Sequence, residues 1–336
     1  MMPVSFGDRA HAYQLKLQNS DLKADLHKLS LELASGQVAD TSKALKGNFA
    51  SLASFEEAAA ALEAYKTTNA EAAFFLDSAQ SALGSIQVVS SEYAPSLLMA
   101  SNAGNAQLVD TAISGAKGNL DAALAALNTR AAGQSIFAGQ ATNQSAVVNA
   151  DAIIAELNPL IAGATTEADF MTVIDNWFDT PGGGFETNAY TGSTQSRSSI
   201  PIGSERTVDY GITALNPDIR TTLKGLTVAA LVSDGAFASQ QSERSNLLKT
   251  AGELLLAGET GIAAVRAEIG HAQNTVDHVA QHNDKERDIL KIAKSELLGK
   301  DPYETAAELQ ATQVQLEALY TMTARISQLS LMDFLR

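Results

Sequence analysis

The chain has 336 residues, of which 38 are acidic, 23 are basic and none is cysteine. Without cysteine, thiol catalysis, disulfides and iron–sulfur clusters are excluded, and the usual ligands of structural zinc sites are missing. A net charge of −15 with no visible basic face argues against a nucleic-acid partner, because phosphate binding needs clustered lysine and arginine.

The negative charge is concentrated in the middle of the chain. Residues 1–46 and 285–336 together carry 13 basic and 13 acidic residues, so the two ends taken together have no net charge. Neutral ends can pack against copies of themselves without repulsion, while an acidic middle favours solubility. No apolar stretch approaches the ~20 residues that a membrane-spanning helix needs, and the opening residues have no apolar core typical of a secretory signal peptide. We therefore expect no membrane partner.

Residues 1–48 are interpreted as an N-terminal assembly helix followed by a linker. From Gln14 onward, leucines recur at steps of seven and four, which predicts an amphipathic helix with one narrow apolar stripe. Ser35-Gly36 is a typical helix end, because glycine enters the left-handed conformation freely. Lys28 and Glu32 are assigned to the solvent-facing sides. The predicted stripe consists of Leu15, Leu22, Leu26, Leu29 and Leu33.

For residues 49–150 we predict a helical rod with a short hairpin near its end. The segment is rich in alanine, and a break in the helix is expected near Ser90 and Pro95, because proline removes a backbone donor. After Gly133, the apolar residues Ile136, Phe137, Val147 and Val148 alternate with glycine and asparagine, which favours a hairpin.

For residues 151–234 we predict a small inserted middle domain that contains both helices and strands. One or two short helices are expected around Pro159 and Trp177. The alternating segment 196–212 predicts two strands joined at Gly203-Ser204. The apolar run 225–232 fits either a buried strand or the start of a helix.

For residues 235–300 we predict a rod helix that returns along the first one. For residues 301–336 we predict a C-terminal assembly helix. Asp301-Pro302 is a helix-start signal, with proline at the first helical position. Apolar residues then recur in steps of three and seven, and the chain is apolar almost to its last residue, which favours burial against a partner. The stripe consists of Leu309, Leu316, Leu319 and Ile326, and the terminal cluster includes Leu329, Leu331, Phe334 and Leu335. The predicted fold is mainly α: a long coiled-coil-like rod formed by both termini, with a small inserted mixed α/β domain.

The search for chemistry yields one weak candidate. His278 and His282 share a helical face near His271, but Val279 stands where a catalytic zinc helix needs glutamate, and no carboxylate trio completes a site. Solvated helix surface is the favoured interpretation, and a soluble helical metal-binding protein is the distant alternative. We expect no enzymatic activity, no cofactor and no bound metal.

Four features of the sequence carry a family resemblance: ELASG at 32–36, GQSIFAG at 133–139, Gly270 in the predicted penultimate helix, and the ending ARISQLSLMDFLR. Together they resemble the flagellin superfamily, and within it most closely the hook-associated protein 3 family of hook–filament junction proteins. One departure is the lone Asp40, where the family usually has a paired-aspartate motif after its Ser-Gly.

The resemblance implies a structural subunit of the bacterial flagellum that joins hook to filament and is exported through the flagellar channel without a cleaved signal. It implies a ring of about eleven copies with three other partners: the other hook-associated junction protein, flagellin and an export chaperone. Assembly is expected through the two terminal stripes, which fold when neighbours bury them. Flagellin itself, the filament subunit, remains the near alternative.

Overall fold

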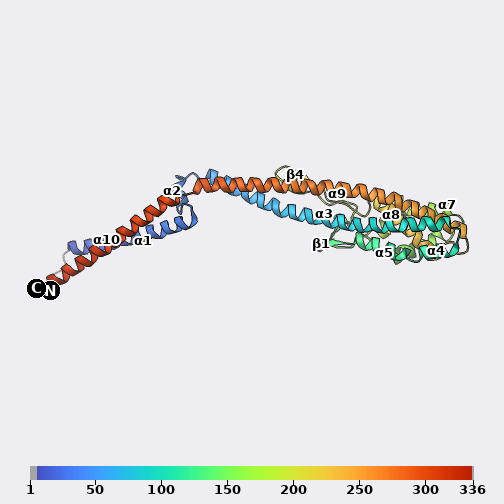
Figure 1. The fold of residues 1–336 in the computed structure, drawn as a ribbon, viewed down its shortest axis with the longest axis horizontal. Coiled ribbons are helices and arrows are strands. Elements are labelled where there is room, and N and C mark those ends of the chain that lie inside the picture. Colours follow the sequence, from blue (N-terminus) through green and yellow to red (C-terminus); the bar gives the residue numbers. More distant parts are fainter. Residues whose placement is uncertain (1–5, 335–336) are drawn as a thin grey trace. The chain divides into compact units, whose positions relative to one another are not determined.

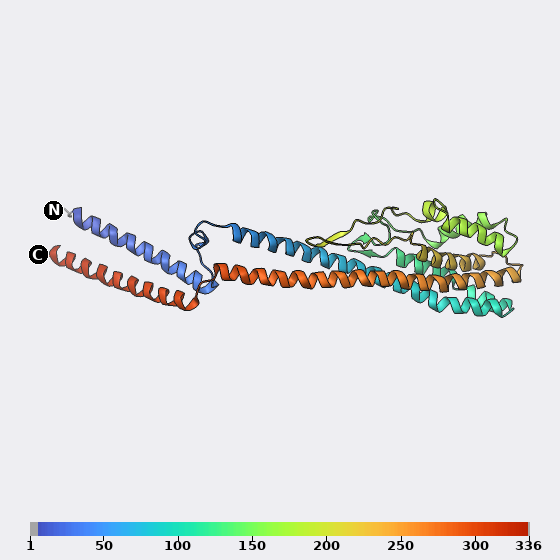
Figure 2. The same cartoon turned by 90° about the horizontal axis from the view of Figure 1, so that it is seen from above.

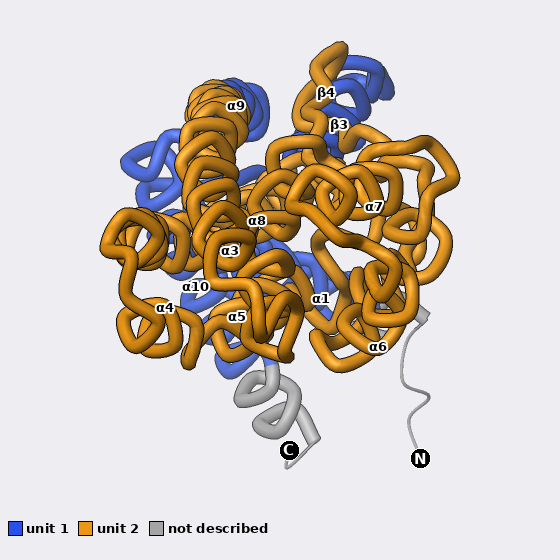
Figure 3. Tube along the Cα trace, turned by 90° about the vertical axis from the view of Figure 1, so that its right-hand side faces the viewer, with its two compact units in different colours: residues 1–62, 285–336 blue, residues 63–284 orange. Residues whose placement is uncertain are grey.

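The computed structural model describes the backbone of residues 6–334 and the side chains of residues 10–11 and 13–326. These residues form two compact units: one contains residues 1–62 and 285–336, and the other contains residues 63–284 (Figure 3). Two long helices, α3 (Ala50–Asn102) and α9 (Gln241–Leu298), contribute residues to both units. The expectation of a mainly α protein with long helices at both ends is confirmed.

The first unit is built on two terminal helices, α1 (Phe6–Ser35) and α10 (Pro302–Phe334). They lie side by side and run in opposite directions (Figures 1 and 2). Asp301 begins α10 by accepting a hydrogen bond from the backbone N–H of Tyr303 at 2.8 Å. The linker after α1 contains one short helix, α2 (Thr41–Ala44), whose first turn is capped by Asp40 through the N–H of Lys43 at 3.0 Å. The lone Asp40 is thus a helix cap.

The second unit packs its helices around α8 (Pro217–Ser233), which is buried over nearly its whole length. Asn216 caps α8 and Pro217 occupies its first turn, so the ambiguous run 225–232 lies in a helix and not in a strand. Helices α4 to α7 contact α8. They are α4 (Ala106–Ile113), α5 (Ala116–Leu127), α6 (Ala150–Ile161) and α7 (Glu167–Asp179), followed by a short π-helix, η1 (Phe185–Ala189).

Two small antiparallel hairpins belong to the second unit. The strands β3 (Ile200–Gly203) and β4 (Arg206–Val208) pair Ile200 with Val208, which confirms the two strands expected in segment 196–212. The carbonyl oxygens of Pro201 and Ile202 accept hydrogen bonds from Thr68 of α3 at 2.8 Å and Asn283 of α9 at 2.9 Å. The hairpin therefore fastens these two helices together.

The other predicted hairpin was placed wrongly. The strands are β1 (Arg130–Ala131) and β2 (Gln134–Ser135), joined by a turn in which Ala132 and Gly133 both have positive φ. Ile136 and Phe137 follow β2 as buried core residues, and Val147 forms an isolated bridge with Tyr190. Tertiary burial, not strand pairing, explains these apolar side chains.

The predicted break near Ser90 and Pro95 is also wrong, because α3 continues through both residues. Tyr93, Ala94 and Leu97 are buried on either side of Pro95, and the proline ring itself is exposed. Packing of the buried face holds the helix together although the proline removes one hydrogen bond on the solvent side.

Candidate assembly interface

The predicted apolar stripes face one another in the α1–α10 pair. Leu29 and Leu319 are buried, with 8% and 7% of their surfaces exposed. Leu33 and Ile326, towards opposite ends of the pair, are exposed. The remaining members are half-buried: Leu15, Leu22, Leu26, Leu309 and Leu316. Leu329, Leu331, Phe334 and Leu335 lie outside the residues whose side chains are described. Within one chain, the two stripes thus bury one another only partly.

A second set of apolar side chains lies on the outer faces of the same two helices. Leu17 and Leu31 on α1 are exposed, as are Val314 and Met322 on α10. Sequence reasoning missed these residues because they fall off the main stripes, although Leu17 and Leu31 are two heptads apart and so share a helical face. Large apolar groups left on both helices suit a surface that further chains cover.

The aromatic ring of Tyr320 joins α10 to α1. Lys23 Nζ lies 5.9 Å from the ring centroid, within the range of a cation–π contact. A hydrogen bond from Asn19, together with a hydrogen bond and the positive charge of Lys23, lowers the pKa of the Tyr320 hydroxyl. The contact shows that Lys23 of α1 stands opposite Tyr320 of α10 in the native pair.

The end of α1 is fastened to the start of α10 by backbone hydrogen bonds. Gly36, with φ of 68°, ends α1 and donates from its N–H to the carbonyl of Glu32 at 2.8 Å. The carbonyl of Gly36 then accepts from the N–H of Lys300 at 3.1 Å, and the N–H of Val38 donates to the carbonyl of Leu298 at 2.9 Å. We call this group of contacts, together with those of the Glu32 carboxylate, the clasp.

The Glu32 carboxylate lies inside the clasp with 3% of the residue exposed, so its assignment to the solvent-facing side of α1 was wrong. One oxygen accepts from the N–H of Ala39 at 3.0 Å, and the other from Lys300 Nζ at 3.1 Å. Lys300 Nζ also lies 2.7 Å from Glu308 of α10, and Lys28 Nζ lies 3.9 Å from Glu32. The linker covers the carboxylate, and no periodic signal in the sequence could have revealed it.

The charge of Glu32 is stabilised where it lies. Burial by itself raises the pKa of this carboxyl, because desolvation disfavours the charged form. The Ala39 and Lys300 hydrogen bonds and the charges of Lys300 and Lys28 outweigh burial and hold the pKa of Glu32 below its ordinary value. In turn, the hydrogen bond to Glu308, followed by that to Glu32, raises the pKa of Lys300. The clasp is therefore ionised near neutral pH.

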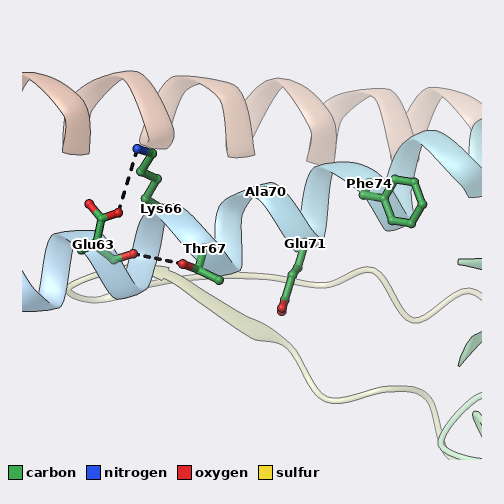
Figure 4. A pocket seen from close by; sticks show the side chains of 6 residues that line it. All are labelled: Glu63, Lys66, Thr67, Ala70, Glu71 and Phe74. Atoms are coloured by element: carbon green, nitrogen blue, oxygen red, sulfur yellow. Dashed lines mark hydrogen bonds and ion pairs between the residues drawn. The ribbon is translucent and has the colours of Figure 1, made fainter. Parts of the chain in front are cut away.

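The second unit has a surface trough on α3, lined by Glu63, Lys66, Thr67, Ala70, Glu71 and Phe74, with a volume of about 440 Å³ (Figure 4). Lys66 Nζ lies 4.0 Å from a Glu63 oxygen, and half of Phe74 is exposed. All six residues recur at helical spacing on one face of α3, so the trough is the exposed side of a helix.

The three histidines lie on exposed positions of α9. Within the described part of the chain, no three histidine, aspartate or glutamate side chains lie close enough together to hold a metal ion. A helix long and apolar enough to cross a membrane is likewise not found among the described residues.

Comparisons with known proteins agree with the resemblance drawn from the sequence. Residues 235–335 match the family described as the bacterial flagellin C-terminal helical region. A putative flagellar hook-associated protein from Vibrio parahaemolyticus has a similar structure, with a TM-score of 0.51 and 15% identity over 73% of this chain and 95% of that one. FlgL from Bacillus cereus gives a TM-score of 0.49 and 13% identity, covering 70% of this chain and 96% of that one. No curated protein matches the chain significantly.

The matched range contains the whole of α9 and the whole of α10. The chain is therefore flagellin-like in its C-terminal region, and its fold resembles that of the Vibrio parahaemolyticus protein.

Proposed function

We propose that this chain is a structural subunit of the bacterial flagellum that joins the hook to the filament and so serves motility. The observation that carries the proposal is the α1–α10 pair, in which a flagellin-like C-terminal helix lies against α1 and leaves apolar side chains exposed on both helices. The protein acts by assembly and not by catalysis.

Assembly buries what the single chain leaves exposed. Neighbouring copies cover Leu17 and Leu31 of α1 and Val314 and Met322 of α10, and each large apolar side chain contributes ~1.5–3 kcal/mol when fully buried. Part of that gain offsets the ordering of the terminal helices, which are marginal alone in water. Folding of the pair and binding of neighbours are thus coupled.

The proposed assembly is a ring of about eleven copies, since closed head-to-tail contacts generate rings. The ring contacts the other hook-associated junction protein on one side and flagellin on the other. Before assembly the chain is exported through the flagellar channel without cleavage of a signal peptide, guided by an export chaperone.

The second candidate function is that of flagellin, the filament subunit, which the match of residues 235–335 to the flagellin C-terminal region favours. The two functions differ in copy number. Sheared filaments contain flagellin as the dominant protein, whereas a junction protein is present in trace amounts.

The test is to delete the gene in the bacterium that encodes the chain, examine the cells by electron microscopy and assay the medium for flagellin. The junction function predicts hooks without filaments and flagellin monomers released into the medium. Restoring the gene on a plasmid should restore filaments. Bare hooks with no flagellin in the medium would instead identify the filament subunit, and normal filaments would contradict both functions.

A further inference from the structure

The apolar stripes by themselves do not fix how α1 and α10 align. Leu15, Leu22 and Leu29 are separated by seven residues, as are Leu309 and Leu316, and Leu319 and Ile326. A heptad-spaced stripe presents nearly the same surface after a slide of seven residues, which is about 10 Å along a helix at 1.5 Å per residue. Some other feature must select one alignment.

The described parts of α1 and α10 contain two buried polar side chains, Glu32 and Thr305. The Thr305 hydroxyl donates to the carbonyl of Asp301 at 2.7 Å, one turn earlier, so it links nothing across the pair. The Glu32 carboxylate reaches across, since it accepts a hydrogen bond from Nζ of Lys300, two residues before the start of α10. Among the described residues of α1 and α10, Glu32 is thus the buried side chain that forms a hydrogen bond from one terminal segment to the other.

A slide of one heptad would separate Glu32 from Lys300 by about 10 Å. The carboxylate would then stay under the linker with Ala39 N–H and with Lys28, which lies 3.9 Å away, but the oxygen that Lys300 serves would lose its hydrogen bond. Leaving a buried charged oxygen without its hydrogen-bond partner is unfavourable. The native alignment alone satisfies both carboxylate oxygens, through Ala39 and Lys300. Buried polar groups are known to act as register devices in helix pairs, at some cost in stability.

We propose that Glu32 is a positioning residue whose buried carboxylate, paired with Lys300, selects the alignment of α1 against α10 among heptad-shifted alternatives. The carboxylate thus sets the specificity of the pairing, in addition to its contribution to stability. The proposal rests on the proposed function only in its consequence, because misaligned pairs would present Leu17, Leu31, Val314 and Met322 in the wrong relative positions for neighbouring copies.

The test uses the full chain, which contains no native cysteine to interfere. Lys23→Cys combined with Tyr320→Cys reports the native alignment, because these two side chains are in contact. Lys16→Cys or Ser30→Cys, each with Tyr320→Cys, reports a shift of seven residues in either direction. Each pair is joined with a short bifunctional thiol reagent, with Glu32 intact and with Glu32→Met.

With Glu32 intact, the native pair should cross-link at least about tenfold more than either shifted pair, since 1.4 kcal/mol already gives a factor of ten. With Glu32→Met, the shifted pairs should rise to yields comparable with the native pair, while the helical content of the chain is retained. The Glu32→Met variant leaves no buried charge without a partner, because Lys300 is partly exposed and still forms its ion pair with Glu308.

Lys300→Met tests the same pair from its other side and should release the shifted cross-links too. Lys28→Met, on the exposed edge of the clasp, is the matched control and should leave native cross-linking dominant. Native cross-linking that stays dominant in Glu32→Met would overturn the proposal and assign the alignment to the backbone hydrogen bonds. These measurements use the isolated chain, so they succeed or fail independently of the deletion experiment.

Discussion

The Glu32 carboxylate is an ionised group enclosed by a linker, and its protonation state bears on the stability of the first unit. Because its folded pKa lies below the ordinary value of 4.5, the folded state favours the charged form. The resulting stabilisation is fully present above pH 4.5 and is lost as the pH falls through the folded pKa. The clasp is accordingly an acid-sensitive contact.

Glu32→Gln should therefore make the stability of the first unit less dependent on pH below 4.5, because glutamine does not titrate and the linkage is removed. At neutral pH the variant should be less stable by roughly 1–2 kcal/mol, the difference between charged and neutral hydrogen bonds. Thermal melts followed by circular dichroism across this range measure both effects. Glu317→Gln, on the exposed surface of α10, is the control. Parallel pH profiles for wild type and Glu32→Gln would contradict the assignment.

At the scale of elements, α3 illustrates how packing overrides a local signal. Pro95 occupies an exposed position of a continuous helix, with buried neighbours on the opposite face. The proline removes one backbone donor and crowds the preceding turn, which costs about 3 kcal/mol in a helix interior. The buried face of α3 offsets this cost.

Pro95→Ala should raise the free energy of unfolding of the second unit by roughly 1–3 kcal/mol, because alanine restores the donor and has the highest helix propensity. Urea titration followed by circular dichroism measures the change. Ser96→Ala, at the adjacent exposed position, controls for alanine itself and should change stability by less than about 0.5 kcal/mol. An unchanged or lower stability in Pro95→Ala would mean that the proline costs the helix nothing at this site.

The elements that the sequence predicted well carry their own local signals. The terminal helices have a clear period, and α10 has the Asp301-Pro302 start. The hairpin β1–β2 was misplaced because its turn depends on the positive φ of Ala132 and Gly133, while the nearby apolar residues are buried by contacts distant in sequence. The alternation of segment 196–212 was correct because both strands lie in one short stretch.

At the scale of the whole molecule, the chain contains two units with separate sources of stability. The second unit has an extensive apolar core around α8, whereas the α1–α10 pair of the first depends on a narrow stripe and the clasp. The pairing of the two ends could be predicted from their matched apolar stripes. The clasp could not be predicted, because Glu32 and Lys300 are far apart in the sequence and belong to no common sequence pattern.

Leu319→Asp should unfold the α1–α10 pair and leave the second unit folded, because a buried charge in the stripe finds no partner. The loss should reach roughly 3–5 kcal/mol for the pair, as expected for an unpaired charge in a buried site. Limited proteolysis should then degrade the terminal helices and leave a protected fragment close to residues 63–284.

Ile326→Asp provides the contrast, because that side chain is 41% exposed and its variant should keep the pair folded while losing assembly into filaments. Loss of the protected fragment in Leu319→Asp would show that the two units fold as one. Normal filaments from either variant would show that these positions do not form the interface.

The clasp also sets an order of events during synthesis. Its two halves, Gly36 and Lys300, are separated by about 260 residues, which a ribosome translating at ~5–20 residues per second takes roughly 13–50 s to add. Throughout that interval α1 has no native partner, and a marginal helix without its partner remains largely unfolded. The translation of α10 decides when α1 folds, so α1 of the newly made chain stays without a stable structure until α10 has been added.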